Sequence, residues 1–473
     1  LFPIAILTGL TDLVVVGLVS RLFSAVVGKE NKPEIPFSDL ISTDPYIKII
    51  WLIVIYIFIN WLASFFRLLL RACQEKLRAS IFLDLTEIAQ KNILKQPYEF
   101  FLTKNSEDLS SKILINISRV SEKLIRPILQ IVSGFFIVTF IFIAILSFAK
   151  LSALYLIVSL IIGYSAISFI VTPNIRKAIR QRILLEKQIS KLMIESLRTI
   201  IDVHLTGSEK YFQNLYSKAR EKAFPHLWKA ETLPEFPRSL IEPFGITLIF
   251  SIGLFPLISN KNPSTFLEII PFFATIAVAS LKLTPPLQDL FRGITDLRAG
   301  IPDLEETLKV IELSESRFVS DQTNIDPIRL NSIIEMKSLY YKYPFFENYA
   351  LKNINLKIGV GCKIAFVGKT GSGKSTTANQ ILGLLKPNSG YIYIDDERLT
   401  KKNILNWQKS CSYVPQTINL LNSSITSNVA YGLEGKAIDI KKVWHSIKMA
   451  QLDKFIEKLP NGVDSIVGDN GIR

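Results

Sequence analysis

The sequence contains little cysteine and little histidine, which excludes several classes of site. Each of these residue types occurs three times in 473 residues. The cysteines lie far apart, with no CxxC pair and no histidine cluster, so the sequence indicates neither a disulfide framework nor a zinc site and suits a reducing cytoplasm. The histidines are interpreted as structural or surface residues. The six positions are Cys73, Cys362, Cys411, His204, His226 and His445.

Acidic residues are also in short supply. The chain has 41 Asp and Glu against 55 Lys and Arg, a formal net charge of +14. The basic residues cluster in two loops between apolar runs, as the positive-inside rule expects of membrane proteins. Because 49% of the residues are hydrophobic, the charge is better explained by a membrane than by nucleic acid, and we expect no nucleic-acid partner.

Six apolar stretches are long enough to cross about 30 Å of hydrocarbon, which takes roughly 20 helical residues each. The second contains an uncharged run, 49–59, that is apolar on every helical face, unlike a buried helix of a soluble protein. Spans three and four are separated by a tight turn near Lys150. The predicted spans are 4–27, 46–70, 127–148, 151–171, 240–258 and 266–283.

Two long connections, 71–126 and 173–238, are rich in charge but keep apolar residues at helical spacing. Their basic excess places them in the cytoplasm, where they are predicted to form helices that project from the membrane. Each has a break near its middle, at 97–109 and at 205–212. The breaks are read as docking points for another domain or as ordinary solvated turns.

The composition changes after the last apolar run. A polar helix at 303–313 and a segment rich in Ser, Asp and Gln follow it. We therefore predict an all-α six-helix transmembrane domain at 1–300, a linker at 301–332 and a second, α/β domain at 333–473. The chain begins without methionine inside an apolar run, so we expect the start to be cut.

A glycine-rich stretch in the last domain matches the phosphate-loop pattern G-x-x-x-x-G-K-[ST]. A buried strand at 363–367 is predicted to enter it and a helix at 375–385 to leave it, so that backbone N–H groups and the helix N-terminus hold phosphates. Beyond the loop, residues 390–395 and 411–416 are predicted to form two further strands. Lys374 is predicted to reach the β- and γ-phosphates and Ser375 to bind Mg²⁺. The predicted ATP-binding residues are Gly368, Lys369, Thr370, Gly371, Ser372, Gly373, Lys374, Ser375 and Thr376.

Six spans followed by a phosphate-loop domain resemble an ATP-binding-cassette (ABC) exporter half-transporter over essentially the whole chain. Tyr343, in Tyr-x-Tyr-Pro, resembles the family's adenine-stacking aromatic, with an ordinary sheet residue as the alternative. Gln416, in Tyr-Val-Pro-Gln, resembles the glutamine loop, which contacts Mg²⁺ and the attacking water and is expected to take part in catalysis. The breaks at 97–109 and 205–212 are similar in position to the family's coupling helices.

The chain also departs from the family pattern. Residues 467–473 resemble the segment ahead of the Ser-Gly-Gly-Gln signature, and the sequence contains neither that signature nor the acidic strand with its catalytic glutamate. Asp395 and Asp396 do not replace that strand, since they resemble a turn. We therefore expect a fragment of an ATP hydrolase coupled to transport, because phosphoryl transfer needs a group that orients water.

The resemblance implies a homodimer, or a heterodimer with a second ABC half, in the plasma (inner) membrane with the nucleotide-binding domain in the cytoplasm. Its expected function is ATP-driven export or flipping of a lipid, glycolipid, peptide or hydrophobic compound by alternating access. The alternative is a nucleotide-gated or regulatory half that binds ATP without hydrolysing it. Residues 236–242 and the linker have a further likeness to flippases of lipid-linked oligosaccharides. Asp12, within the first span, is read as lining a substrate path or as pairing internally.

Overall fold

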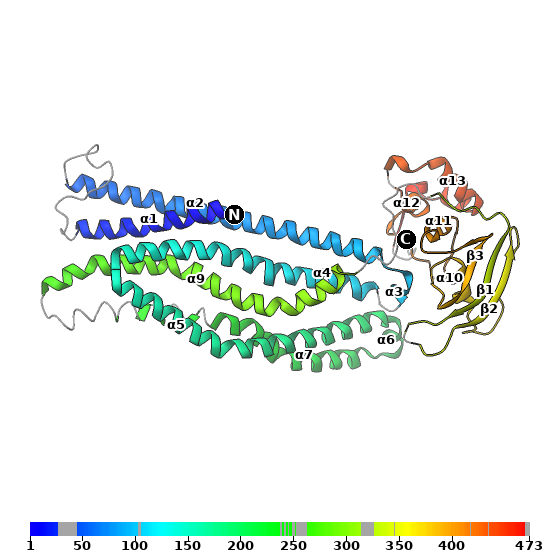
Figure 1. Cartoon of the computed structure of the whole chain (residues 1–473), viewed down its shortest axis with the longest axis horizontal. Coiled ribbons are helices and arrows are strands. Elements are labelled where there is room, and N and C mark those ends of the chain that lie inside the picture. Colours follow the sequence, from blue (N-terminus) through cyan, green and yellow to red (C-terminus); the bar gives the residue numbers. More distant parts are fainter. Residues whose placement is uncertain are drawn as a thin grey trace. The chain divides into compact units, whose positions relative to one another are not determined.

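The computed structural model describes residues 1–26, 45–102, 106–236, 239–240, 243–244, 246–247, 251, 263–313, 326–344, 346–416, 418–433 and 435–468. The chain divides into two compact units, Leu1–Ser316 and Arg317–Arg473. The described part of the first unit is helical, and the second combines antiparallel strands with short helices (Figure 1).

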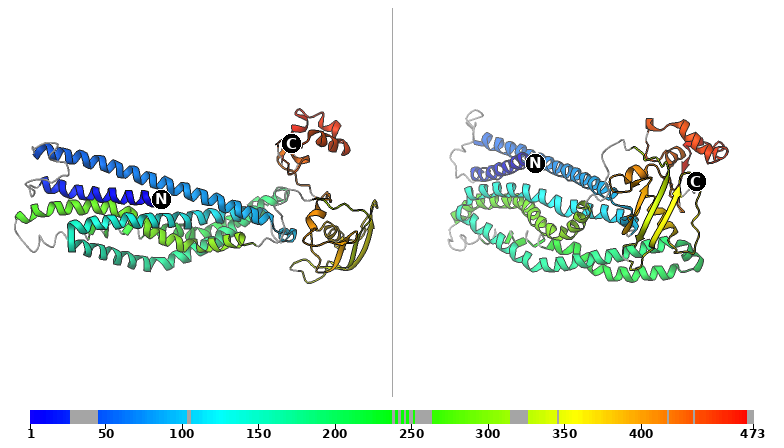
Figure 2. Two further views of the ribbon diagram at one scale, coloured as in Figure 1. Left: turned by 45° about the horizontal axis from the view of Figure 1, so that its top comes forward. Right: turned by 45° about the vertical axis from the view of Figure 1, so that its right-hand side comes forward.

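Long helices that lie side by side build the first unit (Figures 1 and 2). A π-helical turn at Ser121–Ile125 joins α4 to α5, and a 3-10 turn at Leu233–Glu235 follows α7. The helices are α1 (Phe2–Val26), α2 (Pro45–Leu94), α3 (Tyr98–Leu102), α4 (Ser106–Val120), α5 (Arg126–Arg198), α6 (Ile200–Thr206), α7 (Glu209–Thr232) and α9 (Pro263–Ile311).

Three helical segments among the described residues are long and apolar enough to cross a membrane: Phe2–Val26, Ile49–Leu94 and Ile113–Ala144. They overlap the first three predicted spans. Most of the predicted fifth span, 240–258, lies outside the described residues, so the count of six stays a prediction. The 50 residues of α2 extend about 75 Å, more than twice the hydrocarbon thickness, so this helix also continues through the connection predicted to be helical.

The chain reverses direction within α5, although this helix is assigned without a break. Arg119, before α5, forms an ion pair with Glu186, near its end, with 2.7 Å between Nη2 and Oε2. Sixty residues of straight helix between Arg126 and Glu186 would put these groups about 90 Å apart. The reversal is visible in Figure 1 and agrees with the turn predicted near Lys150, while the fourth span itself stays a prediction.

Beyond the apolar region, an ion-pair network joins four helices. Arg119 of α4 contacts Glu186 of α5 at 2.7 Å and Asp303 of α9 at 3.9 Å, while Arg182 pairs with Glu186 at 2.7 Å and with Glu231 of α7. Burial raises the pKa of the Asp303 carboxyl, against the effect of Arg119. The network ties these parts of the four helices together.

Both predicted breaks in the long connections are confirmed. After α2, the chain forms the five-residue helix α3 before α4 begins at Ser106. The second break is at Gly207, whose φ of 62° is in the left-handed region and ends α6; α7 begins two residues later. Leu205 and Tyr211, on either side of this turn, are exposed.

The second unit contains a four-stranded antiparallel sheet in the order β2-β1-β3-β4 and a two-stranded pair, β5-β6. Its strands are β1 (Ile333–Tyr341), β2 (Leu351–Gly359), β3 (Ser389–Ile394), β4 (Glu397–Arg398), β5 (Ser423–Ser424) and β6 (Ile466–Val467). Its helices are α10 (Lys374–Ile381), α11 (Ile404–Gln408), α12 (Ile425–Val429), α13 (Ile440–Met449) and α14 (Asp453–Ile456), with 3-10 turns at Gly435–Ala437 and Gly462–Asp464.

The core of the second unit forms between the sheet and α10 and α11. Met336 and Tyr341 of β1 and Ile392 of β3 pack with Leu385 and Trp407. The buried indole of Trp407 donates a hydrogen bond of 2.7 Å to the carbonyl of Ile381, at the end of α10. This core holds the helix that follows the phosphate loop against the sheet.

Two strand predictions are wrong. Residues 363–367, predicted as a buried strand entering the phosphate loop, and residues 411–416 both lack strand structure. Val367 is 93% exposed and Val414 is 83% exposed. A strand needs a neighbour that accepts its backbone hydrogen bonds, and no described segment pairs with either of these. The predicted strand at 390–395 is confirmed as β3, which alternates between buried and exposed residues.

The helix after the phosphate loop is shorter than the predicted 375–385. It ends at Ile381 because Gly383 adopts a left-handed φ of 68°. The N–H of Leu384 then donates to the carbonyl of Asn379 and that of Gly383 to Gln380, a Schellman-type end.

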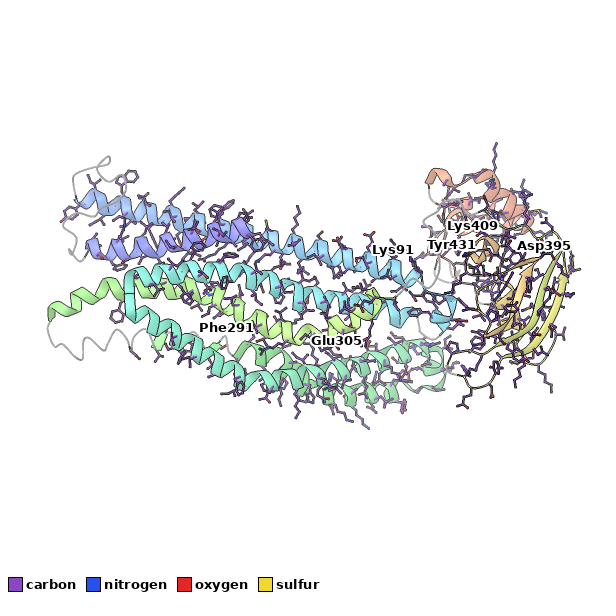
Figure 3. All side chains as sticks on the ribbon, in the orientation of Figure 1. Lys91, Phe291, Glu305, Asp395, Lys409 and Tyr431 are labelled. Atoms are coloured by element: carbon purple, nitrogen blue, oxygen red, sulfur yellow. The ribbon has the colours of Figure 1, made fainter. Side chains whose placement is uncertain are left out.

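Asp395 forms the predicted turn after β3 and connects it to the chain that enters β1 (Figure 3). Its carboxylate accepts hydrogen bonds from the backbone N–H groups of Asn331, Ser332 and Ile333 at 3.0, 2.7 and 2.8 Å. These bonds lower the pKa of Asp395 below its usual 3.8, since they favour the ionised form.

Replacing Asp395 with Asn removes the charge that the three N–H groups bind, so the second unit should melt at a lower temperature at neutral pH. Because the folded-state pKa is lowered, the wild-type carboxylate contributes its stability above about pH 4 and loses it as the pH falls through the folded pKa. The difference between wild type and Asp395→Asn should therefore vanish in acid. Thermal unfolding followed by tryptophan fluorescence at several pH values tests this; a difference independent of pH would contradict it.

Gly390 opens β3 in a conformation that no other residue tolerates there. Its φ is 86°, and a Cβ would lie 2.3 Å from the carbonyl oxygen of Ser338 and 2.6 Å from that of Lys337. Gly432 has a similar φ of 82° with nothing within 4 Å of its Cβ position. Gly390→Ala should therefore destabilise the unit by several kcal/mol, and the control Gly432→Ala by about 1 kcal/mol. Equal losses in thermal or denaturant unfolding would mean that the close approach of β1 adds nothing to the cost of the left-handed φ.

Candidate nucleotide site

At its last turn, the phosphate loop adopts a backbone conformation that requires glycine. Gly373 has a φ of 87°, and a Cβ on it would lie 2.7 Å from Cδ2 of Leu351 and 2.9 Å from the carbonyl oxygen of Ala350. At the other end of the loop, a Cβ on Gly368 would lie 2.8 Å from the hydroxyl of Ser372. The loop is therefore tight and closed on itself, as a phosphate cradle must be.

Helix α10 begins at Lys374, directly after this turn. The backbone N–H and the hydroxyl of Thr377 both donate to the carbonyl of Gly373, at 2.8 and 3.0 Å, which ties the first helical turn to the loop. The N-terminal N–H groups of a helix have no partner within the helix and attract anions. Ser375 lies exposed in this first turn, where its hydroxyl is available to a metal ion.

Lys374 folds back over its own loop. Its ammonium group donates to the carbonyls of Gly368 and Lys369 at 2.9 and 3.0 Å. The side chain is thus held above the loop and would exchange these two neutral acceptors for phosphate oxygens, which form stronger, charge-assisted hydrogen bonds. The residues present fit a polyphosphate chain.

Tyr343 lies just after β1, half-buried, and is connected directly to the loop. Its hydroxyl is 3.0 Å from the hydroxyl of buried Thr376 in α10. Its ring makes edge contacts with Tyr341 and Phe346, with centroids 4.9 and 6.5 Å apart. No sequence pattern connects residues 33 positions apart in this way, so only the structure shows this link.

Gln416 is exposed in the irregular segment 412–416. Within the part of the chain that the structure describes, it forms no hydrogen bond or ion pair, and none joins it to Ser375. The structure therefore unites Tyr343, Lys374 and Thr376 at one site and does not add Gln416 to it.

Two family models match the chain. The model of the ABC transporter transmembrane region matches residues 2–236, and the ABC transporter model matches residues 351–470. The matched residues include α1 to α7 in the first unit, and the phosphate loop and α10 in the second.

Curated bacterial relatives match much of the chain at low identity. An ATP-dependent lipid A-core flippase of Coxiella burnetii is 23% identical over 408 residues, which cover 84% of this chain and 66% of the relative. A protein of the same name from Pectobacterium atrosepticum is 30% identical over 236 residues, which cover 50% of this chain and 40% of the relative. The chain thus spans less than two thirds of the length of these relatives.

A solved structure shares the fold. A bacterial Atm1-family ABC exporter with ATP bound matches with a TM-score of 0.78 and 19% identity, over 99% of this chain and 80% of that chain. Helical unit, phosphate loop and both family models agree, and the chain belongs to the ABC transporter family.

Proposed function

We propose that this chain is an exporter half that uses ATP to flip or export a lipid or similar amphipathic compound across a membrane. The observation that carries the proposal is a phosphate loop of suitable geometry in the same chain as a unit of apolar helices. The names of the relatives, ATP-dependent lipid A-core flippases, support a lipid as the cargo. Glycolipids, peptides and hydrophobic compounds are the wider class.

Each residue of the site has a proposed role toward ATP and Mg²⁺. Lys374 and the N–H groups of the loop would hold the phosphates, Ser375 would bind Mg²⁺, and Tyr343 would stack on the adenine. Gln416 would join them through a movement of its segment, contacting Mg²⁺ and the attacking water. When bound, ATP supplies the free energy for the conformational change and its hydrolysis resets the protein.

The proposed assembly is a dimer of this chain, or a pair with a different ABC half. It would lie in the plasma (inner) membrane as a multi-pass protein, with the second unit in the cytoplasm. The exposed turns at α3 and at Gly207 would receive the movement of the nucleotide-binding unit and pass it to the spans. This requires ATP to contact the closed state better than the open one.

Replacing Lys374 with Ala should weaken ATP binding on the order of 100-fold, because the phosphates lose a charge-assisted contact. Lys363→Ala is the matched control, since it removes the same charge from an exposed position outside the loop and should leave binding almost unchanged. Titration with a fluorescent ATP analogue measures both. Unchanged affinity in Lys374→Ala would overturn the nucleotide site.

Tyr343→Ala should weaken ATP binding about 10-fold while changing tripolyphosphate binding much less, since only ATP offers a base to stack on. Tyr343→Phe keeps the ring and removes the hydroxyl that contacts Thr376, so it should retain most of the affinity. Competition titrations with both ligands compare the variants. Equal losses for ATP and tripolyphosphate in Tyr343→Ala would argue against stacking.

A further inference from the structure

A cluster of charged residues lies within the apolar part of the first unit. Asp12 of α1 is fully buried, and its two carboxylate oxygens accept hydrogen bonds from Nη2 and Nε of Arg67 at 2.5 and 3.3 Å. The ammonium group of Lys282, from α9, lies 3.6 Å from the same carboxylate and donates to Oδ1 of Asn60 at 2.7 Å. Asp12 therefore pairs internally, and three helices meet at it.

The polar residues that α2 contributes lie on its inner face, because they are spaced by seven residues. Asn60, Arg67 and Gln74 are seven residues apart and share one helical face, which also carries buried Ala63 and Leu70. Each of the three polar residues bonds to a different helix: Asn60 to α9, Arg67 to α1 and Gln74 to Ser133 of α5.

The other face of α2 is apolar and exposed. Trp61, Phe65 and Leu68 lie on it, with exposed fractions of 58–75%, as expected of a surface in contact with lipid. Arg67 is therefore not a residue that extends along the helix surface to reach the membrane edge. It lies on the inner face by sequence position and by its contact with Asp12.

The charges of the cluster do not balance. Two cations share a single carboxylate, and among the described residues Asp12 is the one acid that pairs with either cation. The cluster thus has a formal charge of +1 in a region where an uncompensated charge costs at least about 3 kcal/mol. Arg67 uses Nε and Nη2 on Asp12, which leaves Nη1 as a donor, and its side chain is 35% exposed. Lys282 is 14% exposed.

We propose that this cluster is an anion site that binds the phosphate-type headgroup of the amphipathic cargo through Arg67, with Lys282 supplying the excess charge. This inference rests on the proposed function, since the cargo is the molecule that enters the membrane unit. Asp12 limits the net charge to +1, so the headgroup is bound without being trapped. Arg67 contacts the cargo, Asp12 and Lys282 set the net charge of the site, and Asn60 positions Lys282.

The test changes the net charge in both directions. Lys282→Met keeps the Asp12–Arg67 pair and similar side-chain bulk but makes the cluster neutral, whereas Asp12→Asn raises its charge to +2. If charge determines binding, affinity for dodecyl phosphate should fall at least about 10-fold in Lys282→Met and rise in Asp12→Asn. Lys309→Met is the matched control, on the same helix but exposed and paired with Glu306, and should bind as wild type does.

Equilibrium binding of radiolabelled dodecyl phosphate to the full chain in an uncharged detergent provides the measurement. Dodecylphosphocholine has the same tail with a zwitterionic headgroup of no net charge, so its binding should differ much less among the variants. Inorganic phosphate distinguishes the source of the anion: if it binds as tightly as dodecyl phosphate, the site serves a free anion and the cargo assignment is overturned. Unchanged dodecyl phosphate binding in Lys282→Met, or weakened binding in Asp12→Asn as well, overturns the anion site and leaves a purely structural cluster.

Binding of a fluorescent ATP analogue to each variant separates this inference from the proposed function. If the variants bind ATP normally and their affinity for dodecyl phosphate does not change with the charge of the cluster, only the anion site is overturned. Failure of the wild-type chain to bind ATP would overturn the proposed function itself. A variant that binds ATP as wild type does has a folded nucleotide-binding unit. A melting temperature like that of the wild type shows that its membrane unit is folded as well.

Discussion

The absence of water from a bilayer interior is the constraint on which the first unit depends. Every backbone N–H and C=O there must find a partner within the protein, and a continuous helix achieves this without help from neighbours. Helices α2 and α9 therefore run unbroken through 50 and 49 residues, far beyond the hydrocarbon. Outside the membrane, helices can carry charge, and there Arg119, Arg182 and their acidic partners join α4, α5, α7 and α9. One set of rigid elements thus serves both environments.

The second unit depends on backbone geometry instead. Gly373 and Gly390 occupy positions where a Cβ would meet another backbone at less than 3 Å. The first allows the phosphate loop to turn into α10, and the second brings β3 against β1. The nucleotide site is therefore a product of close backbone approach, and hydrogen bonds connect Lys374 and Tyr343 to it. These bonds leave the site organised before a ligand enters.

The charged cluster inside the membrane unit joins helices and is also the proposed anion site. A buried carboxylate that holds an arginine and a lysine joins α1, α2 and α9, and removing one partner of such a pair is normally very destabilising. The Asp12–Arg67 pair is neutral by itself and joins α1 to α2, whereas Lys282 adds α9 together with an excess positive charge. That imbalance is the reason to assign a ligand to the cluster, and it connects the architecture of the unit to the chemistry of its cargo.

Sequence alone determined the first three membrane helices, the helical extension of α2, the phosphate loop and both breaks, because each follows from a local pattern of hydropathy, glycine or charge. It identified Asp12 as unusual but left open what it contacts. It was wrong about strands at 363–367 and 411–416, because a short apolar run reveals nothing about whether a neighbour will pair with it. Only the tertiary structure decided the contacts between distant residues. It brought Tyr343 to Thr376 and Asp12 to Arg67 and Lys282, since such contacts depend on how whole elements pack and not on any spacing along the chain.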